Sequence, residues 1–160
     1  MALQNPPAQQ PITDKIVTPQ WLLWFNAIKD FLDNGIFSQV LVNKATGLIG
    51  YTTGAGGTVT QATSKGTSVI LNKPTGQITM HNAALAAGAV VGFPVTNSLV
   101  TLSDVVVCSI KNGSVTSVGN YSIITSPGGG AFEVWVRNVS AGGLSEAVII
   151  SYSVIKGATT

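Results

Sequence analysis

The stretch Ala131-Phe-Glu-Val-Trp-Val-Arg-Asn138 decides the fold class of this chain. Apolar residues recur at every second position, so that one face carries Phe132, Val134 and Val136. The opposite face carries Glu133, Trp135 and Arg137. A period of two is typical of a β-strand with one buried face and one exposed face. The stretch therefore predicts a half-buried strand whose outward face presents Trp135.

The same kind of signal continues on both sides of this strand, over residues 37–160. Short β-branched runs follow one another at spacings near ten residues, and turn signals at 73–76, 112–113, 127–130 and 141–143 separate some of them. We expect strands at 39–42, 58–61, 68–72, 77–81, 90–96, 104–111, 121–125, 131–138 and 147–155. In the last of them, alternation predicts one face made of Val148, Ile150, Tyr152 and Val154.

This number of short strands predicts a mainly β fold, an antiparallel β-sandwich with a jelly roll as its leading version. An immunoglobulin-like sandwich is the alternative, although the chain lacks its Cys–Trp–Cys pattern. Cys108 is the single cysteine, so an internal disulfide is excluded. Because Cys108 lies in an apolar run, we expect it to pack as a small core side chain.

A helix is expected at residues 18–34, ahead of the β-domain. Thr18 is a suitable N-cap, Pro19 suits the first helical position, and Gly35 suits the C-terminal cap. Apolar side chains recur at spacings of three and four, which predicts an amphipathic helix with one wide apolar face. That face carries Trp21, Leu22, Trp24, Phe25, Ile28, Phe31 and Leu32.

This apolar face is expected to bind a partner, because so short a helix is marginally stable alone in water. It could pack on its own β-domain, on copies of itself or on another protein. Its width exceeds the narrow seam of a two-stranded coiled coil, which favours a trimeric bundle or a host surface. The chain thus divides into an extended Pro-rich arm (1–17), an anchor or oligomerisation helix (18–35) and a β-sandwich domain (36–160).

The composition also indicates covered surface. Charged residues make up 9% of the chain, against about 25% in an ordinary soluble domain. Other chains, or a coat of Thr, Ser, Asn and Gly, must then cover much of the outside. The net charge of +2, without a run of Lys or Arg, carries no footprint of nucleic-acid binding.

Neither a membrane span nor a signal peptide is expected. The longest apolar stretch, residues 83–95, is interrupted by Gly88, Gly92 and Pro94 and is shorter than the ~20 residues of a spanning helix. The polar, Pro-rich start lacks the basic and apolar regions of a signal peptide. We therefore expect the chain to be made and folded in a cytoplasm.

Chemistry-bearing residues are scarce. His81 is the only histidine, and the β-domain carries three carboxylates, Asp104, Glu133 and Glu146, on different predicted strands. A catalytic triad would have to use His81, and glycoside hydrolysis would need two of the carboxylates to converge. One histidine and one cysteine cannot form a four-ligand zinc site. We predict no catalytic residue, no metal and no cofactor, and a protein that is not an enzyme.

Trp135 is the aromatic residue predicted to face outward from the β-domain. An exposed Trp on a sheet can stack on a sugar or pack against another subunit. The low charge of the chain favours subunit packing over sugar stacking.

The order of segments resembles that of tailed-bacteriophage virion proteins. Pro11-Ile-Thr-Asp14 and Thr18-Pro-Gln-Trp-Leu-Leu-Trp-Phe25 resemble their attachment segments. Later stretches resemble a β-domain that recurs in tail-fibre and head-decoration proteins. They are 54–65, 69–73, 76–80, 93–98, Asp104, Tyr121 and 132–138. The resemblance implies a homotrimer whose N-terminal part binds other virion proteins at the head, neck or tail.

Three functions follow as expectations. The first is a virion structural protein, a short fibre, spike or decoration subunit that is assembled in the host cytoplasm. The second is a carbohydrate- or receptor-binding module that recognises a host surface glycan. The third, a polysaccharide-cleaving enzyme, is disfavoured by the scarcity of carboxylates.

Overall fold

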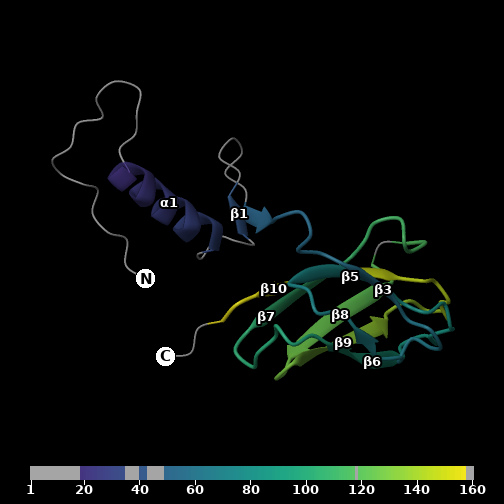
Figure 1. The fold of residues 1–160 in the computed structure, drawn as a ribbon. Coiled ribbons are helices and arrows are strands. Elements are labelled where there is room, and N and C mark those ends of the chain that lie inside the picture. Colours follow the sequence, from purple (N-terminus) through teal and green to yellow (C-terminus); the bar gives the residue numbers. More distant parts are fainter. Residues whose placement is uncertain (1–18, 35–39, 43–48, 118, 158–160) are drawn as a thin grey trace. The chain divides into compact units, whose positions relative to one another are not determined.

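A computed structural model describes residues 19–34, 40–42, 49–117 and 119–157 (Figure 1). The chain forms two compact units, Met1–Thr52 and Thr53–Thr160. The first unit contains helix α1 (Pro19–Asn34) and an antiparallel pair of strands, β1 (Val40–Val42) and β2 (Ile49–Tyr51). The expected helix is confirmed, whereas the arm at 1–17 and both expected caps lie outside the described residues. Strand β2 was not predicted, because Gly50 leaves no run of β-branched residues there.

The described part of the second unit contains two four-stranded sheets, and the fold is mainly β as expected (Figure 1). In spatial order, the first sheet consists of β3 (Thr58–Thr60), β5 (Thr75–Thr79), β10 (Ile149–Ile155) and β7 (Val105–Ile110). The second consists of β4 (Val69–Ile70), β6 (Val90–Thr96), β9 (Ala131–Asn138) and β8 (Tyr121–Pro127). Strands β6 and β9 have the bounds that the sequence predicted.

Both sheets are mixed, so the expectation of a purely antiparallel fold was wrong at two edge strands. Strand β3 pairs with β5 in parallel, and β4 pairs with β6 in parallel. The chain alternates between the sheets from β3 to β8, and β8–β9 is the one hairpin among the described pairs of the second unit. A strand that returns by way of the other sheet is not forced to reverse its direction as a hairpin is.

Gly76 was expected in a turn but lies inside β5, which begins at Thr75. A Cβ atom at Gly76 would sit 2.7 Å from Leu71 Cδ2 and 3.0 Å from Tyr152 Cε1. The glycine therefore makes room for the Tyr152 ring within the sheet, a reason that no local turn signal reveals.

One hydrophobic core joins the two sheets. The rings of Phe132 on β9 and Tyr152 on β10 lie with their centroids 5.0 Å apart, at an interplanar angle of 54°. The alternation predicted for β10 is confirmed, because Val148, Ile150, Tyr152 and Val154 are buried. Cys108 packs against this core as expected, and burial raises the pKa of its thiol to about 12.

Asn138, at the end of β9, is fully buried and fastens the neighbouring loops. Its Nδ2 donates to the carbonyl oxygens of Leu85 (2.9 Å) and Gly142 (2.7 Å), and its Oδ1 accepts from Ser140 N (2.9 Å). A buried amide with both donors and its acceptor satisfied holds its surroundings in one arrangement. It thereby keeps the end of the central strand β9 in place.

Candidate interaction surface

Strand β9 carries the surface feature that the sequence singled out. Phe132, Val134 and Val136 are at most 1% exposed, whereas Trp135 between them is 43% exposed. The predicted outward direction of Trp135 is therefore confirmed. The physical cause is the two-residue period of the strand, which sends alternate side chains into the core and into solvent.

Trp135 occupies the middle of a row that crosses three strands. Its cross-strand partners are Gly92 on β6 and Ile124 on β8. Ile124 is 67% exposed, so the side chains of this row form an outward apolar strip. Cross-strand neighbours on one face lie close enough to contact each other.

The indole lies face-on over Gly92. A Cβ atom built on Gly92 would be 2.7, 2.8 and 3.0 Å from Cε3, Cζ3 and Cδ2 of Trp135. Three consecutive ring atoms can be nearly equidistant from one point only if that point lies over the ring, because an in-plane approach would place the third atom farther away. One face of the indole therefore covers Gly92, and the other face is turned outward.

Charged side chains bracket this row on the same outer face. Glu133 pairs across the strands with Pro94 and Ser126, and Arg137 pairs with Val90 and Ser122. Within the described residues, neither Glu133, Arg137 nor the Trp135 indole N–H has a hydrogen-bond or ion-pair partner. We call this surface, centred on Trp135 with Glu133 and Arg137 beside it, the Trp135 face.

The outer face of the other sheet has a different character. Within its four strands the outward side chains are uncharged: Thr58, Thr60, Thr75, Gln77, Thr79, Val105, Val107, Ser109, Ile149, Ser151, Ser153 and Ile155. Val105 pairs across the strands with Ile155, and Val107 lies one row further along. These three residues, which we call the Val105 patch, are 51–55% exposed.

A shallow hollow of about 530 Å³ lies at the other edge of this sheet, over β3 and β5. It is lined by Gly56, Gly57, Thr58, Thr75, Gly76, Gln77 and Ser151. These residues supply hydroxyl, amide and backbone groups. None of them has a side chain that exchanges protons near neutral pH, so they offer hydrogen bonding and not acid–base chemistry.

The helix residues predicted to bind a partner belong to the first unit. Leu22 and Phe25 are 54% and 44% exposed, and Leu23 beside them is 69% exposed. Trp24 and Ile28 are half-buried, and the rings of Trp24 and Phe25 meet edge to face with centroids 5.2 Å apart. The side chains of Trp21, Phe31 and Leu32 lie outside the described residues. The binding role of this helix stays a prediction.

The carboxylates weighed as catalytic candidates lie apart. Asp104 directly precedes Val105, which pairs with Ile155, whereas Glu146 precedes the other end of β10. The two therefore lie at opposite ends of the β7–β10 pair. Glu133 lies on the outer face of the other sheet.

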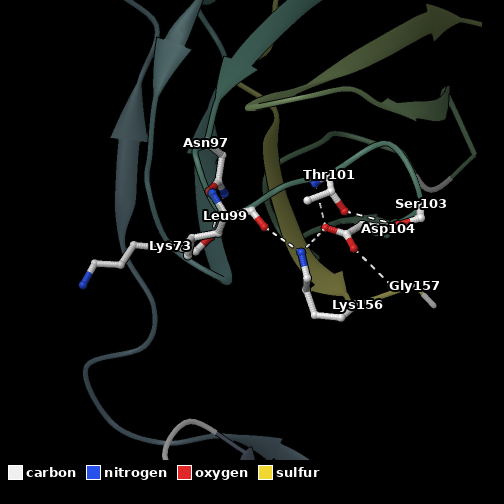
Figure 2. A network of polar contacts seen from close by, with 8 residues as sticks. All are labelled: Lys73, Asn97, Leu99, Thr101, Ser103, Asp104, Lys156 and Gly157. Atoms are coloured by element: carbon white, nitrogen blue, oxygen red, sulfur yellow. Dashed lines mark hydrogen bonds and ion pairs between the residues drawn. The ribbon is translucent and has the colours of Figure 1, made fainter. Parts of the chain in front are cut away.

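Asp104 holds the C-terminal end of β10 against the preceding loop. Figure 2 shows the Lys156 ammonium between the Asp104 carboxylate and the Leu99 carbonyl oxygen, at 2.6 and 2.9 Å. Asp104 also accepts hydrogen bonds from the backbone N–H groups of Thr101 (2.8 Å) and Gly157 (3.1 Å). The Lys156 hydrogen bond is the main cause that holds the pKa of Asp104 well below its usual range. These contacts fasten the C-terminal end of β10 to the loop before β7.

Sequence reasoning missed one buried cation. Lys65 is 4% exposed, and its Nζ donates to the carbonyl oxygens of His81 (2.7 Å) and Glu146 (2.6 Å). Burial lowers the pKa of Lys65, and the Glu146 carboxylate opposes that change. The neighbouring His81 accepts a hydrogen bond from Ala83 N at Nδ1 (3.0 Å). Nothing in the local sequence marks Lys65, because its partners are distant in the chain.

Comparison with known proteins gives no match for this chain. The chain matches no family model, no curated protein and no solved structure. Among the described residues, no group of three His, Cys, Asp or Glu side chains could hold a metal ion. No helix within the described ranges has the length and apolar character needed to cross a bilayer.

Proposed function

We propose that this chain is a structural subunit of a tailed-bacteriophage virion: a homotrimeric short fibre, spike or decoration subunit. The observation that carries the assembly part is the Val105 patch, whose three large apolar side chains are half-exposed on a sheet face whose strand residues are uncharged. The centres of subunit interfaces are depleted of charge in the same way. The virion assignment rests on the resemblance of the sequence.

The energetics favour covering this patch with another subunit. Burying a large apolar side chain gains roughly 1.5–3 kcal/mol, and exposed apolar patches mark contact sites. The Thr and Ser hydroxyls in neighbouring rows can bond to a partner or to interfacial water, so burying them need not leave unsatisfied polar groups. A trimer in which this face meets a neighbouring subunit would bury the apolar side chains and also pair the hydroxyl groups.

Attachment to the particle is proposed for the N-terminal arm and helix α1. The division of the chain at Thr52 supports a separate attachment unit, and exposed Leu22 and Phe25 give the helix an apolar surface for a virion partner. In this proposal the subunit assembles in the host cytoplasm. It acts without a cofactor, a catalytic residue, nucleic acid or a membrane.

We also propose a reduced jelly roll as the topology of the second unit, with its sheets packed as a sandwich. The strand orders β5-β10-β7 and β6-β9-β8 support it, because successive strands from β5 to β8 alternate between the two sheets. Two sheets that share the Phe132–Tyr152 contact are compatible with such a sandwich. The edge strands β3 and β4 extend the two sheets in parallel.

The mass of the full chain in solution tests the proposed assembly. Light scattering at micromolar concentration should give three chains, and Val105→Asp should shift the mass toward one chain because a charge would be buried in the interface. Val139→Asp is the matched control, since Val139 is 49% exposed and lies outside the patch. A wild-type monomer, or equal effects of both variants, would contradict the assembly role.

A carbohydrate-binding module is the second candidate function. The observation that favours it is the face-on packing of Trp135 over Gly92, which leaves one indole face turned outward.

A further inference from the structure

We propose that Trp135, Glu133 and Arg137 form a binding site for one pyranose unit of a glycan chain. The proposal rests on the carbohydrate-binding function given above as the second candidate, for which it names the site and the sugar class, and it is independent of the structural role. It commits to a sugar whose ring presents an apolar face, such as glucose in β-linkage, with all its ring hydroxyl groups equatorial.

The first support is the open indole face. Because Gly92 supports one side of the ring, the other side forms a flat plate, and Trp135 keeps 43% of its surface exposed. A pyranose with equatorial hydroxyls carries its axial C–H bonds on its two faces. The negative π-face of an aromatic ring attracts such weakly positive hydrogens, and the contact buries apolar area on both partners.

Hydrogen-bonding groups stand on both sides of this plate. Glu133 and Arg137 lie two residues before and after Trp135 on the same face of β9, which places their Cα atoms about 6–7 Å from that of Trp135. A carboxylate accepts hydrogen bonds from sugar hydroxyls, and a guanidinium donates them. Both groups lack partners within the described residues, so they can bond to the rim of a stacked ring.

The charge pattern favours a sugar over a protein on this face. The row of Gly92, Trp135 and Ile124 is flanked by one row in which Glu133 pairs with Pro94 and another in which Arg137 pairs with Val90. A protein lying flat here would bury both unpaired charges, which is costly. A sugar ring covers only the plate and meets the charges with its hydroxyls. The Val105 patch, with uncharged rows on its outer face, suits a protein partner better.

Gly92 also prepares the site before any ligand arrives. Its missing Cβ lets the indole lie flat, so the ring does not have to be ordered on binding. Side chains that are held in the bound conformation reduce the entropic cost of association. The same glycine allows a variant that disturbs the plate while keeping the tryptophan.

Titration of the full chain with cellohexaose, followed by calorimetry and by the NMR signal of the Trp135 indole N–H, tests the proposal. For the wild type we expect a Kd of about 1 mM or lower. For Trp135→Ala we expect a Kd that is higher by about tenfold or more. Gly92→Ala should also weaken binding, because the added Cβ would displace the Trp135 indole from its position over residue 92. Gly129→Ala is the matched control, with nothing within 4 Å of its added Cβ, and should bind as the wild type does.

Thermal unfolding and light scattering of each variant complete the design. If Trp135→Ala does not fold, Arg137→Gln replaces it and should still weaken binding, since it removes the charge of one flank. Three outcomes overturn the proposal: no binding of cellohexaose, maltohexaose or chitohexaose at about 10 mM; binding that Trp135→Ala leaves unchanged; or loss of self-association in Trp135→Ala with no glycan bound. The last would assign the Trp135 face to subunit contact.

Discussion

The six-membered ring of Trp135 covers Gly92 so closely that a Cβ at residue 92 would sit 2.7 Å from Cε3 of the indole. Gly92 is therefore needed for space, since Trp135 and Gly92 are directly paired neighbours on β9 and β6. The pair converts an exposed aromatic side chain into a fixed plate. Its consequences can be measured without knowing the ligand.

Gly92→Ala should displace the indole at little cost in stability. Trp135 lies on the surface and can rotate outward, so the free energy of unfolding should change by no more than about 1 kcal/mol. The near-ultraviolet circular dichroism of Trp135, recorded with Trp21→Phe and Trp24→Phe in place, should change clearly. The same spectrum in Gly129→Ala should match the parent. An unchanged spectrum in Gly92→Ala would mean that the ring does not rest on Gly92.

Gly157→Ala should destabilise the second unit. Its Cβ would overlap the Ser103 carbonyl oxygen, so the backbone would have to move and the hydrogen bond from Gly157 N to Asp104 would be strained or lost. Forced overpacking of this kind typically costs about 1–3 kcal/mol. Urea unfolding measures the loss, and Gly142→Ala, which meets nothing within 4 Å, should stay near the wild type.

Asp104 should make the protein acid-sensitive. The pKa of Asp104 in the folded state is lowered, chiefly by its hydrogen bond with Lys156. Its stabilising contribution is therefore present above its ordinary value of 3.8 and is lost as the pH falls below it. Asp104→Asn should be less stable at neutral pH and should show a flatter decline in acid. Glu133→Gln, which removes an exposed carboxylate without an ion pair among the described residues, controls for the loss of one negative charge.

Cys108 and Tyr152 should make stability fall in alkali. Burial raises the pKa of each to about 12, from 9.0 and 10.0. Because the unfolded chain loses these protons first, stability is complete below about pH 9 and declines above it, by up to ~1.4 kcal/mol per pH unit for each such group. In urea unfolding between about pH 8 and pH 11, Cys108→Val should reduce the decline. A slope equal to that of the wild type would argue against a buried thiol.

Residues 53–160 should fold without the first unit. Both four-stranded sheets and the hydrophobic core belong to this part of the chain. We expect the truncated protein to unfold cooperatively in urea and to show a strand-rich circular dichroism spectrum. A non-cooperative transition would mean that helix α1 contributes to the core.

The sequence predicted the elements with a strong local period. Alternation in 131–138 was sufficient to place Trp135 outward and Val134 inward, because the side-chain direction in a strand depends on the backbone alone. Helix α1 followed from apolar spacings of three and four. A predicted strand boundary was wrong where the role of a residue depends on a partner distant in the sequence. Gly76 is the example, because it makes room for the Tyr152 ring.

The candidate site divides in the same way. The sequence was sufficient to assign Trp135, Glu133 and Arg137 to one face. It could not predict the packing of Trp135 on Gly92, because Gly92 lies 43 positions away, on a strand that the fold brings alongside β9. The Lys156–Asp104 and Lys65–Glu146 contacts likewise join residues far apart in the chain. The parallel placement of β3 and β4 also depends on the path between sheets. Local periods therefore determined which way side chains point, and only the tertiary structure decided which of them meet, since that depends on how the strands are ordered in space.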